Sequence, residues 1–145
     1  MIVYLDTSAV VPILIAEPST DACRRIWNDA DRRVSSRLTY VETSAALAMA
    51  ERHARISAGE YEAAWSNFVD IWPDVDVVDL TAELSATAAS FARSLSLRGY
   101  DAVHCASAAE LNDPELVAAA GDTTLLAAWR SLGLAVIDTN QRRRD

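Results

Sequence analysis

Short apolar runs alternate with longer amphipathic segments along the chain. The first run, residues 2–5, consists of strand formers and stops at Asp6, which is typical of a central parallel strand covered on both faces. Residues 75–80 alternate between apolar and charged positions, as a half-buried strand does. Further strands are expected at 33–37, 116–120 and 134–137.

Helical segments separate the expected strands, and capping residues and prolines indicate where these helices begin and end. Ser57 and Glu60 have the spacing of a capping box, and Pro73 follows the end of that helix. Thr39 is expected to open another helix, with Glu42 in its first turn. The other helices are expected at 7–17, 19–30, 81–99, 101–111 and 123–132. This alternation predicts an α/β fold, a three-layer α/β/α sandwich around a mostly parallel four- to five-stranded sheet.

The length of 145 residues and the apolar content of 51% match one globular domain. We expect this domain to span residues 1–140, followed by an Arg-rich, frayed tail at 141–145. No stretch approaches the roughly 20 apolar residues that a membrane span needs. The apolar N-terminus also lacks the cationic start of a signal peptide. These features predict a cytoplasmic protein that makes no membrane contact.

Composition excludes several classes of chemistry. The 13 basic residues are all arginine, so Schiff-base, P-loop and receiver-domain mechanisms have no lysine to use. The 4 glycines are too scattered to form a phosphate-cradling loop, which argues against a nucleotide cofactor. Cys23, Cys105 and the two histidines show no paired-ligand spacing for zinc.

Four acidic residues occupy positions that suggest a shared site. Asp6 and Asp122 follow apolar strands, and the carboxyl ends of strands in an open α/β sheet line the crevice where ligands bind. Asp101 opens a helix, and Glu42 lies in the first turn of another. Because helix N-termini favour negative charge, we expect both carboxyls to stay ionised. If the four converge, repulsion would force some of them to take up protons unless a cation is present. Oxygen-only ligation suits Mg²⁺ or Mn²⁺, the ions of phosphodiester hydrolysis.

Each acid also has a purely structural interpretation. Asp6 can cap a helix, and Glu42 can form half of a capping box with Thr39. Asp101 can complement a helix dipole, and Asp122 can serve as a turn residue. Their joint occurrence favours the site over four separate structural roles.

Four segments, in this order and spacing, resemble the PIN-domain ribonucleases and, more narrowly, the VapC toxins. They are residues 3–9, the helix start around Val41-Glu42 within 36–46, residues 97–104 and residues 121–125. The resemblance covers residues 1–137. It implies that Asp6, Glu42, Asp101 and Asp122 are the catalytic, metal-binding acids.

The same resemblance assigns supporting roles near these acids. It implies that Thr7 and Ser8 orient Asp6 or a water, and it makes Thr123 a weaker candidate. The chain departs from the family at its end, where Asp138-Thr139-Asn140 replaces the common Asn-Pro turn. Whether Asp138 also faces the site therefore stays open.

The function implied by the resemblance is that of a Mg²⁺-dependent endoribonuclease, with Mn²⁺ able to substitute, that cuts single-stranded or loop regions of structured RNA. It further implies a toxin that forms a homodimer and is blocked by a small VapB-like antitoxin encoded by a neighbouring gene. The net charge of −8, less four site acids, leaves −4, so RNA is expected to be held locally by arginines. The alternative is a catalytically weak PIN-like binding module whose acidic pocket holds a structural ion or a basic partner peptide.

Three further features have two interpretations each. His104, one turn after Asp101, is either a satisfied buried histidine or a donor to a metal-binding acid. Residues 142–144, all arginine, are either a solvated tail or phosphate contacts. An aromatic stripe at helical spacing either packs in the core or contacts a partner helix, and it consists of Tyr61, Trp65, Phe68 and Trp72.

Overall fold

Five parallel strands form one sheet in the computed structural model, which describes residues 1–141 of the chain. Their order across the sheet is β3-β2-β1-β4-β5, and every neighbouring pair is parallel. The strands are β1 (Ile2–Leu5), β2 (Arg32–Ser36), β3 (Val75–Val78), β4 (Leu116–Ala120) and β5 (Ala135–Asp138). The predicted α/β architecture is confirmed.

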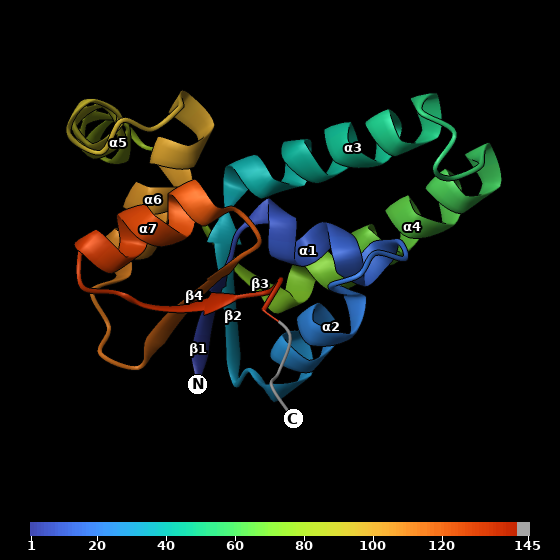
Figure 1. Cartoon of the computed structure of the whole chain (residues 1–145), viewed down its shortest axis with the longest axis horizontal. Coiled ribbons are helices and arrows are strands. Elements are labelled where there is room, and N and C mark those ends of the chain that lie inside the picture. The colour runs from blue at the N-terminus through green and yellow to red at the C-terminus, as the bar shows by residue number, and fades with distance from the viewer. Residues whose placement is uncertain (142–145) are drawn as a thin grey trace.

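Helices connect successive strands and cover both faces of the sheet (Figure 1). They are α1 (Thr7–Leu14), α2 (Thr20–Asp29), α3 (Arg37–Arg52), α4 (Ala58–Ile71), α5 (Ala82–Ser94), α6 (Gly99–Leu111) and α7 (Thr123–Ser131). A short 3₁₀ turn, η1 (Trp72–Asp74), leads from α4 into β3. Within residues 1–141, none of the helices is both long and apolar enough to cross a membrane.

The alternation of side chains along β1 explains the three layers. Tyr4 points to one face, where it joins a buried cluster with Trp129 and other residues of α5, α6 and α7. Val3 and Leu5 point to the other face and pack with Phe68 and with residues of α1 and α2. Because β1 is buried on both faces, its sequence is continuously apolar, as expected of a central parallel strand.

The strand order changes direction beside β1, which creates a switch point between β1 and β4. The chain passes from β1 to β2 and β3 on one side, whereas β4 and β5 lie on the other side. Leu5 pairs with Ala119 in register, and the amide of Asp6 extends this ladder by donating to the Ala119 carbonyl at 3.1 Å. Ligand crevices in open α/β sheets lie at such a point, beyond the carboxyl ends of the strands.

Helix α3 begins earlier than the sequence predicts. Ser36, not Thr39, is the N-cap, and its hydroxyl accepts a hydrogen bond from the Leu38 amide at 3.1 Å. Glu42 consequently lies beyond the first turn, so the expected capping box with Thr39 is wrong. Thr39 is buried instead, where its hydroxyl accepts from Ser35 at 2.7 Å. The capping box of Ser57 with Glu60 at the start of α4 is confirmed.

The aromatic stripe of α4 packs within the chain. Phe68 is 1% exposed, and Trp65, Trp72 and Tyr61 are partly buried in neighbouring apolar clusters. Tyr40 of α3 closes over the stripe, with its ring 5.3–5.7 Å from the rings of Trp65, Phe68 and Trp72. Core packing therefore accounts for the stripe, while contact with a partner stays a prediction. The arginines 142–144 of the expected tail lie outside the described residues.

Candidate metal-binding site

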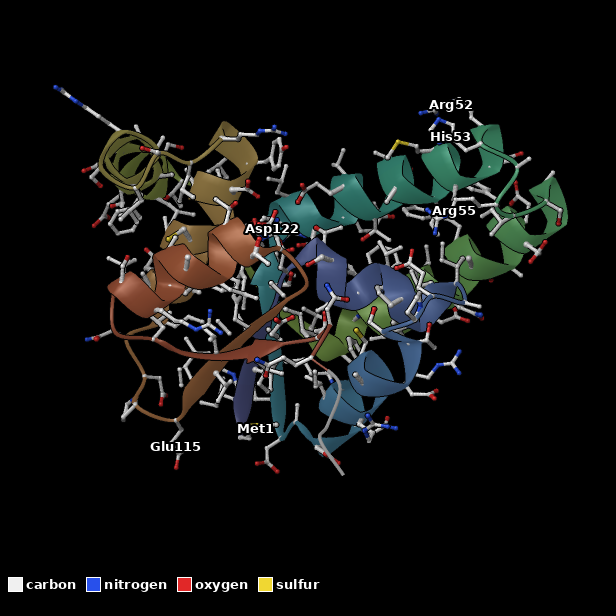
Figure 2. All side chains as sticks on the ribbon, viewed as in Figure 1. Met1, Arg52, His53, Arg55, Glu115 and Asp122 are labelled. Carbon is white, nitrogen blue, oxygen red and sulfur yellow. The ribbon has the colours of Figure 1, made fainter. Side chains whose placement is uncertain are left out.

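Asp6 and Asp122 lie at the carboxyl ends of the adjacent strands β1 and β4, as the sequence predicts. Figure 2 shows Asp122 on the opposite side of the molecule from Met1 and Glu115, which mark the other ends of these strands. Both acids also cap helices, because Asp6 accepts from the Ser8 amide and Asp122 from the Leu125 amide. Capping and site formation are therefore compatible at these two positions.

Glu42 reaches the same region from α3, although it is not near the helix N-terminus. Its Oε1 accepts from the Thr7 hydroxyl at 2.9 Å and lies 2.5 Å from His104 Nε2. That imidazole nitrogen is also 3.4 Å from Asp6 Oδ1. Glu42 and Asp6 therefore face one histidine, which brings the two carboxylates close together.

Asp101 completes the group from the first turn of α6 and is 9% exposed. Burial, followed by the charges of Asp122, Asp6 and Glu42, raises the pKa of Asp101 to about 6. Desolvation and like charges thus outweigh the helix dipole at Asp101, and proton uptake, expected of converging acids, begins at a higher pH than in a free carboxyl. The shift also means that the four predicted acids lie within electrostatic reach of one another, as a cation site requires.

The expected supporting hydroxyls of Thr7 and Ser8 make direct contacts in the site. Ser8 Oγ donates to Asp6 Oδ2 at 2.5 Å and accepts from the Gly121 amide at 2.8 Å. Thr7 orients Glu42 rather than Asp6. Ser8 thus ties the turn after β4 to the first acid of the chain.

Two weaker candidates make no contact with the four acids that the structure records. Thr123, directly after Asp122, lines a hollow between α5 and α7 with Leu95, and its role in the site stays a prediction. Asp138 accepts from the Asn140 amide at 2.9 Å and lines a separate pocket with Arg25 and Arg130. The structure therefore does not bring Asp138 into the group formed by the four acids.

The donor atoms of the cluster fit a hard cation. All four acids offer carboxylate oxygens, the ligands that Mg²⁺ and Mn²⁺ prefer. Within residues 1–141, no three His, Cys, Asp or Glu side chains are placed to ligate one ion directly. Because Mg²⁺ is usually bound through one or two carboxylates and several waters, the remaining acids would act through water.

A profile of the PIN domain matches residues 3–128. The chain belongs to the PIN-domain family. Ribonuclease VapC49 of Mycobacterium tuberculosis is 38% identical over 135 residues, which cover 93% of this chain and 94% of the relative.

Solved structures of other proteins share the fold. VapC20 of Mycobacterium tuberculosis, described as a sarcin-ricin loop cleaving toxin, aligns with a TM-score of 0.67 at 20% identity, over 87% of this chain and 94% of that chain. A toxin-antitoxin complex from Klebsiella pneumoniae aligns with a TM-score of 0.67 at 11% identity, over 97% of this chain and 99% of that chain.

Sequence reasoning missed several residues that support this PIN-domain site. The sequence pattern predicts only a buried strand position for Tyr4, whereas in the structure its hydroxyl lies 2.8 Å from His104 Nδ1. Burial lowers the pKa of His104. The hydrogen bond to Glu42 and the charge of Asp6 together outweigh this effect, so the pKa is raised overall. Asn140 donates to the Gly121 carbonyl at 3.0 Å and lines a pocket with Ser8. The turn-forming sequence around Asn140 is the only local signal for its role.

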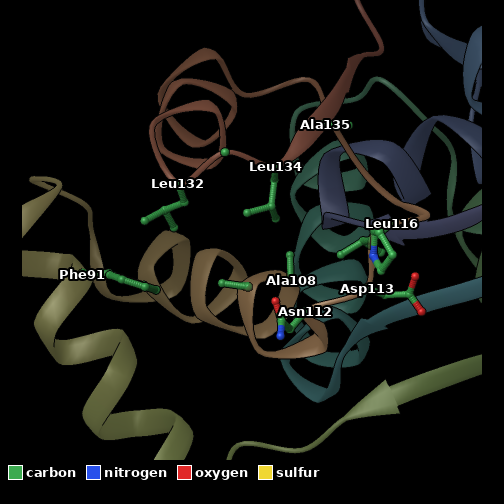
Figure 3. Close-up of a pocket in the computed structure, with 11 residues that line it drawn as sticks. Phe91, Ala108, Asn112, Asp113, Leu116, Leu132, Leu134 and Ala135 are labelled. Carbon is green, nitrogen blue, oxygen red and sulfur yellow. The ribbon is translucent and has the colours of Figure 1, made fainter.

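A separate apolar hollow of about 510 Å³ lies at the other end of the PIN domain (Figure 3). Leu116 and Leu134 line it close to the amino ends of β4 and β5, together with Phe91 of α5. Asp113 is the one acid among its lining residues.

Proposed function

We propose that this PIN-domain protein is a Mg²⁺-dependent endoribonuclease that acts as the toxin of a toxin-antitoxin pair. One observation carries the proposal: Asp6, Glu42, Asp101 and Asp122 reach one edge of the sheet from four different elements. The 38% identity to Ribonuclease VapC49 supports the same reaction class.

The four carboxylates would hold the divalent cation, directly or through water, with Mn²⁺ as a possible substitute. When bound there, a divalent cation supplies Lewis-acid activation of water and neutralises charge that develops on the phosphate. The residues of the chain prepare this site. Thr7 fixes Glu42 and Ser8 fixes Asp6. Preorganised carboxylates need no rearrangement when the substrate arrives.

RNA would be held beside the acids by an exposed pair of side chains. Arg98 donates to the Tyr100 hydroxyl at 3.1 Å, and this hydrogen bond, with smaller contributions from the charges of Asp101 and Asp122, raises the pKa of Arg98. Tyr100 is 45% exposed and offers a face on which an unpaired base can stack. A guanidinium contributes the phosphate contact that an acidic protein otherwise lacks. This arrangement favours single-stranded or loop RNA over a duplex.

The remaining parts of the proposal concern partners and location. The related fold in a toxin-antitoxin complex supports a small VapB-like antitoxin as the partner of this chain. We further propose that the protein forms a homodimer and acts in the cytoplasm, where its RNA substrate lies. Residues 1–140 would act as a single PIN-like unit.

The decisive experiment incubates the purified protein with total RNA, with and without Mg²⁺ or Mn²⁺. Asp6→Asn and Asp101→Asn remove one site charge each, and Asp70→Asn is the matched control because Asp70 is exposed on α4. We expect discrete fragments that require metal, appear with wild type and Asp70→Asn, and vanish in both site variants. Equal fragments from every variant would overturn the proposal and favour a binding module with little activity.

A further inference from the structure

His104 is buried directly beneath the acidic cluster. It lies on α6, one turn after Asp101, and is 1% exposed. Its Nε2 is 2.5 Å from Glu42 Oε1 and 3.4 Å from Asp6 Oδ1. A buried polar group this close to two carboxylates makes an energetically strong contact, since the local dielectric is low.

Tyr4 holds the opposite side of the imidazole. Its hydroxyl lies 2.8 Å from His104 Nδ1, and its ring packs edge-on against His104 and Trp129 with centroids 6.0 and 5.8 Å away. When the Tyr4 hydroxyl donates to Nδ1, the ring proton must reside on Nε2. An imidazolium would also carry a proton on Nε2. In both cases Nε2 donates to Glu42.

This bond determines which carboxylate oxygens are available. Glu42 Oε1 accepts hydrogen bonds from both Thr7 and His104, so Oε2 is the oxygen that remains for a cation. Both Ser8 bonds to Asp6 end on Oδ2, while Oδ1 faces His104. Without the imidazole, Glu42 would keep only the Thr7 bond and could rotate.

We propose that His104 is a positioning residue that fixes Glu42 and Asp6 in the geometry that binds the divalent cation. The inference rests on the proposed function and deepens it, because it assigns cation affinity to a residue that need not touch the cation. Groups that orient metal ligands typically change metal affinity about 10–100-fold when they are removed.

The test compares two substitutions at this position with a matched control elsewhere. His104→Leu removes the donor, whereas the amide of His104→Gln can still donate to Glu42. His53→Leu is the control, because His53 is exposed at the C-terminal end of α3, well apart from Asp122 in Figure 2. Each protein is stripped of metal, Mn²⁺ alone is titrated in by calorimetry, and unfolding is measured without metal.

We expect His104→Leu to raise the Kd for Mn²⁺ about 10–100-fold, His104→Gln to retain most of the affinity, and His53→Leu to match wild type. A merely structural histidine predicts loss of stability with unchanged Mn²⁺ affinity, and that result overturns the inference. If His104→Leu does not fold, His104→Ala decides, because it also removes the donor to Glu42; a wild-type Kd in His104→Ala then overturns the inference.

Failure of the inference and failure of the proposed function give different results. If wild type cuts RNA and binds Mn²⁺ while folded His104→Leu binds it equally well, the inference alone is wrong. If wild type itself neither binds Mn²⁺ nor cuts RNA, the proposed function is wrong, and the role of His104 is overturned with it.

Discussion

The backbone amide of Gly121 donates a 2.8 Å hydrogen bond to the hydroxyl of Ser8, although 113 positions separate the two residues. The same hydroxyl donates to Asp6, so one side chain connects the turn after β4 to the acid after β1. These two strands are neighbours across the switch point of the sheet. The contact therefore holds together the loops that carry Asp6 and Asp122.

Ser8→Ala is expected to reduce RNA cleavage about 10–100-fold, the usual effect of removing a group that orients a metal ligand. The variant leaves Asp6 without its 2.5 Å partner and the Gly121 amide without its acceptor. The rate of metal-dependent cleavage is the measurement. Ser85→Ala is the control, since that exposed hydroxyl bonds only to the Thr81 carbonyl of its own helix. Equal rates in wild type and Ser8→Ala would contradict the role assigned to Ser8.

Gly121→Ala is expected to destabilise the protein by roughly 1–3 kcal/mol, the usual cost of overpacking. A Cβ at this position would lie 3.1 Å from Asn140 Nδ2 and 3.1 Å from Thr139 Oγ1. Gly59→Ala is the control, because its Cβ would meet only Ser57 Oγ at 3.9 Å and alanine favours the helix. Chemical denaturation measures both variants. If Gly121→Ala is as stable as Gly59→Ala, the close packing around Gly121 is refuted.

Metal-free Asp101→Asn is expected to be more stable than metal-free wild type at pH 8. The folded pKa of Asp101 is about 6, above the ordinary value of 3.8. Above pH 6 the folded state bears the full cost of this buried charge. As the pH falls from about 6 toward 3.8, the folded state binds the proton first, so wild type gains stability relative to the variant.

The measurement for Asp101 is the difference in Tm between variant and wild type from pH 8 to pH 4.5, in the presence of a chelator. The difference should be positive at pH 8 and shrink as the solution becomes more acidic. A difference that does not depend on pH would show that the carboxyl is not strained by burial and by its acidic neighbours.

Arg98→Ala is expected to raise KM for RNA and to leave kcat nearly unchanged, because Arg98 is proposed to contact phosphate and not the metal. The affinity for single-stranded RNA should also depend less on salt: the slope of log K against log salt concentration (the salt slope) should become shallower by about 0.7 when one phosphate contact is lost. Binding can be measured in an Asp6→Asn background, where RNA stays intact. Arg52→Ala is the matched control, as Arg52 lies at the far end of α3 (Figure 2). An unchanged salt slope would exclude Arg98 from the RNA contact.

Cys23 and Cys105 are expected to resist thiol reagents in the folded protein. They are 1% and 0% exposed, and burial raises the pKa of the Cys105 thiol to about 11. Little thiolate therefore forms at pH 8. Titration with a chromogenic disulfide should detect no thiol in the native protein and 2 in denaturant. Rapid reaction of the native protein would mean that the helices over these residues open readily.

Local signals in the sequence were sufficient for most of the fold. The apolar run 2–5 stops at Asp6 because a buried strand ends there, and Ser57 with Glu60 marks the start of α4 through bonds three residues apart. The start of α3 was misplaced because Ser36 and Thr39 are both competent caps, and only burial of Thr39 beside Ser35 decides between them.

The local pattern was enough to place Asp6 and Asp122 after strands and Asp101 at a helix start, because such positions depend on neighbouring residues, but it misplaced Glu42 within α3. Only the tertiary structure decided what holds those acids. His104 contacts Glu42 across 62 positions and Tyr4 across 100, and such pairs become neighbours only when parallel strands and their helices are packed. Asp138, the last residue of β5, lines a pocket with Arg25 and Arg130, which its sequence position after an apolar run does not reveal. Side-chain periodicity specifies a face of an element, whereas the meeting of two faces depends on the order of strands in the sheet.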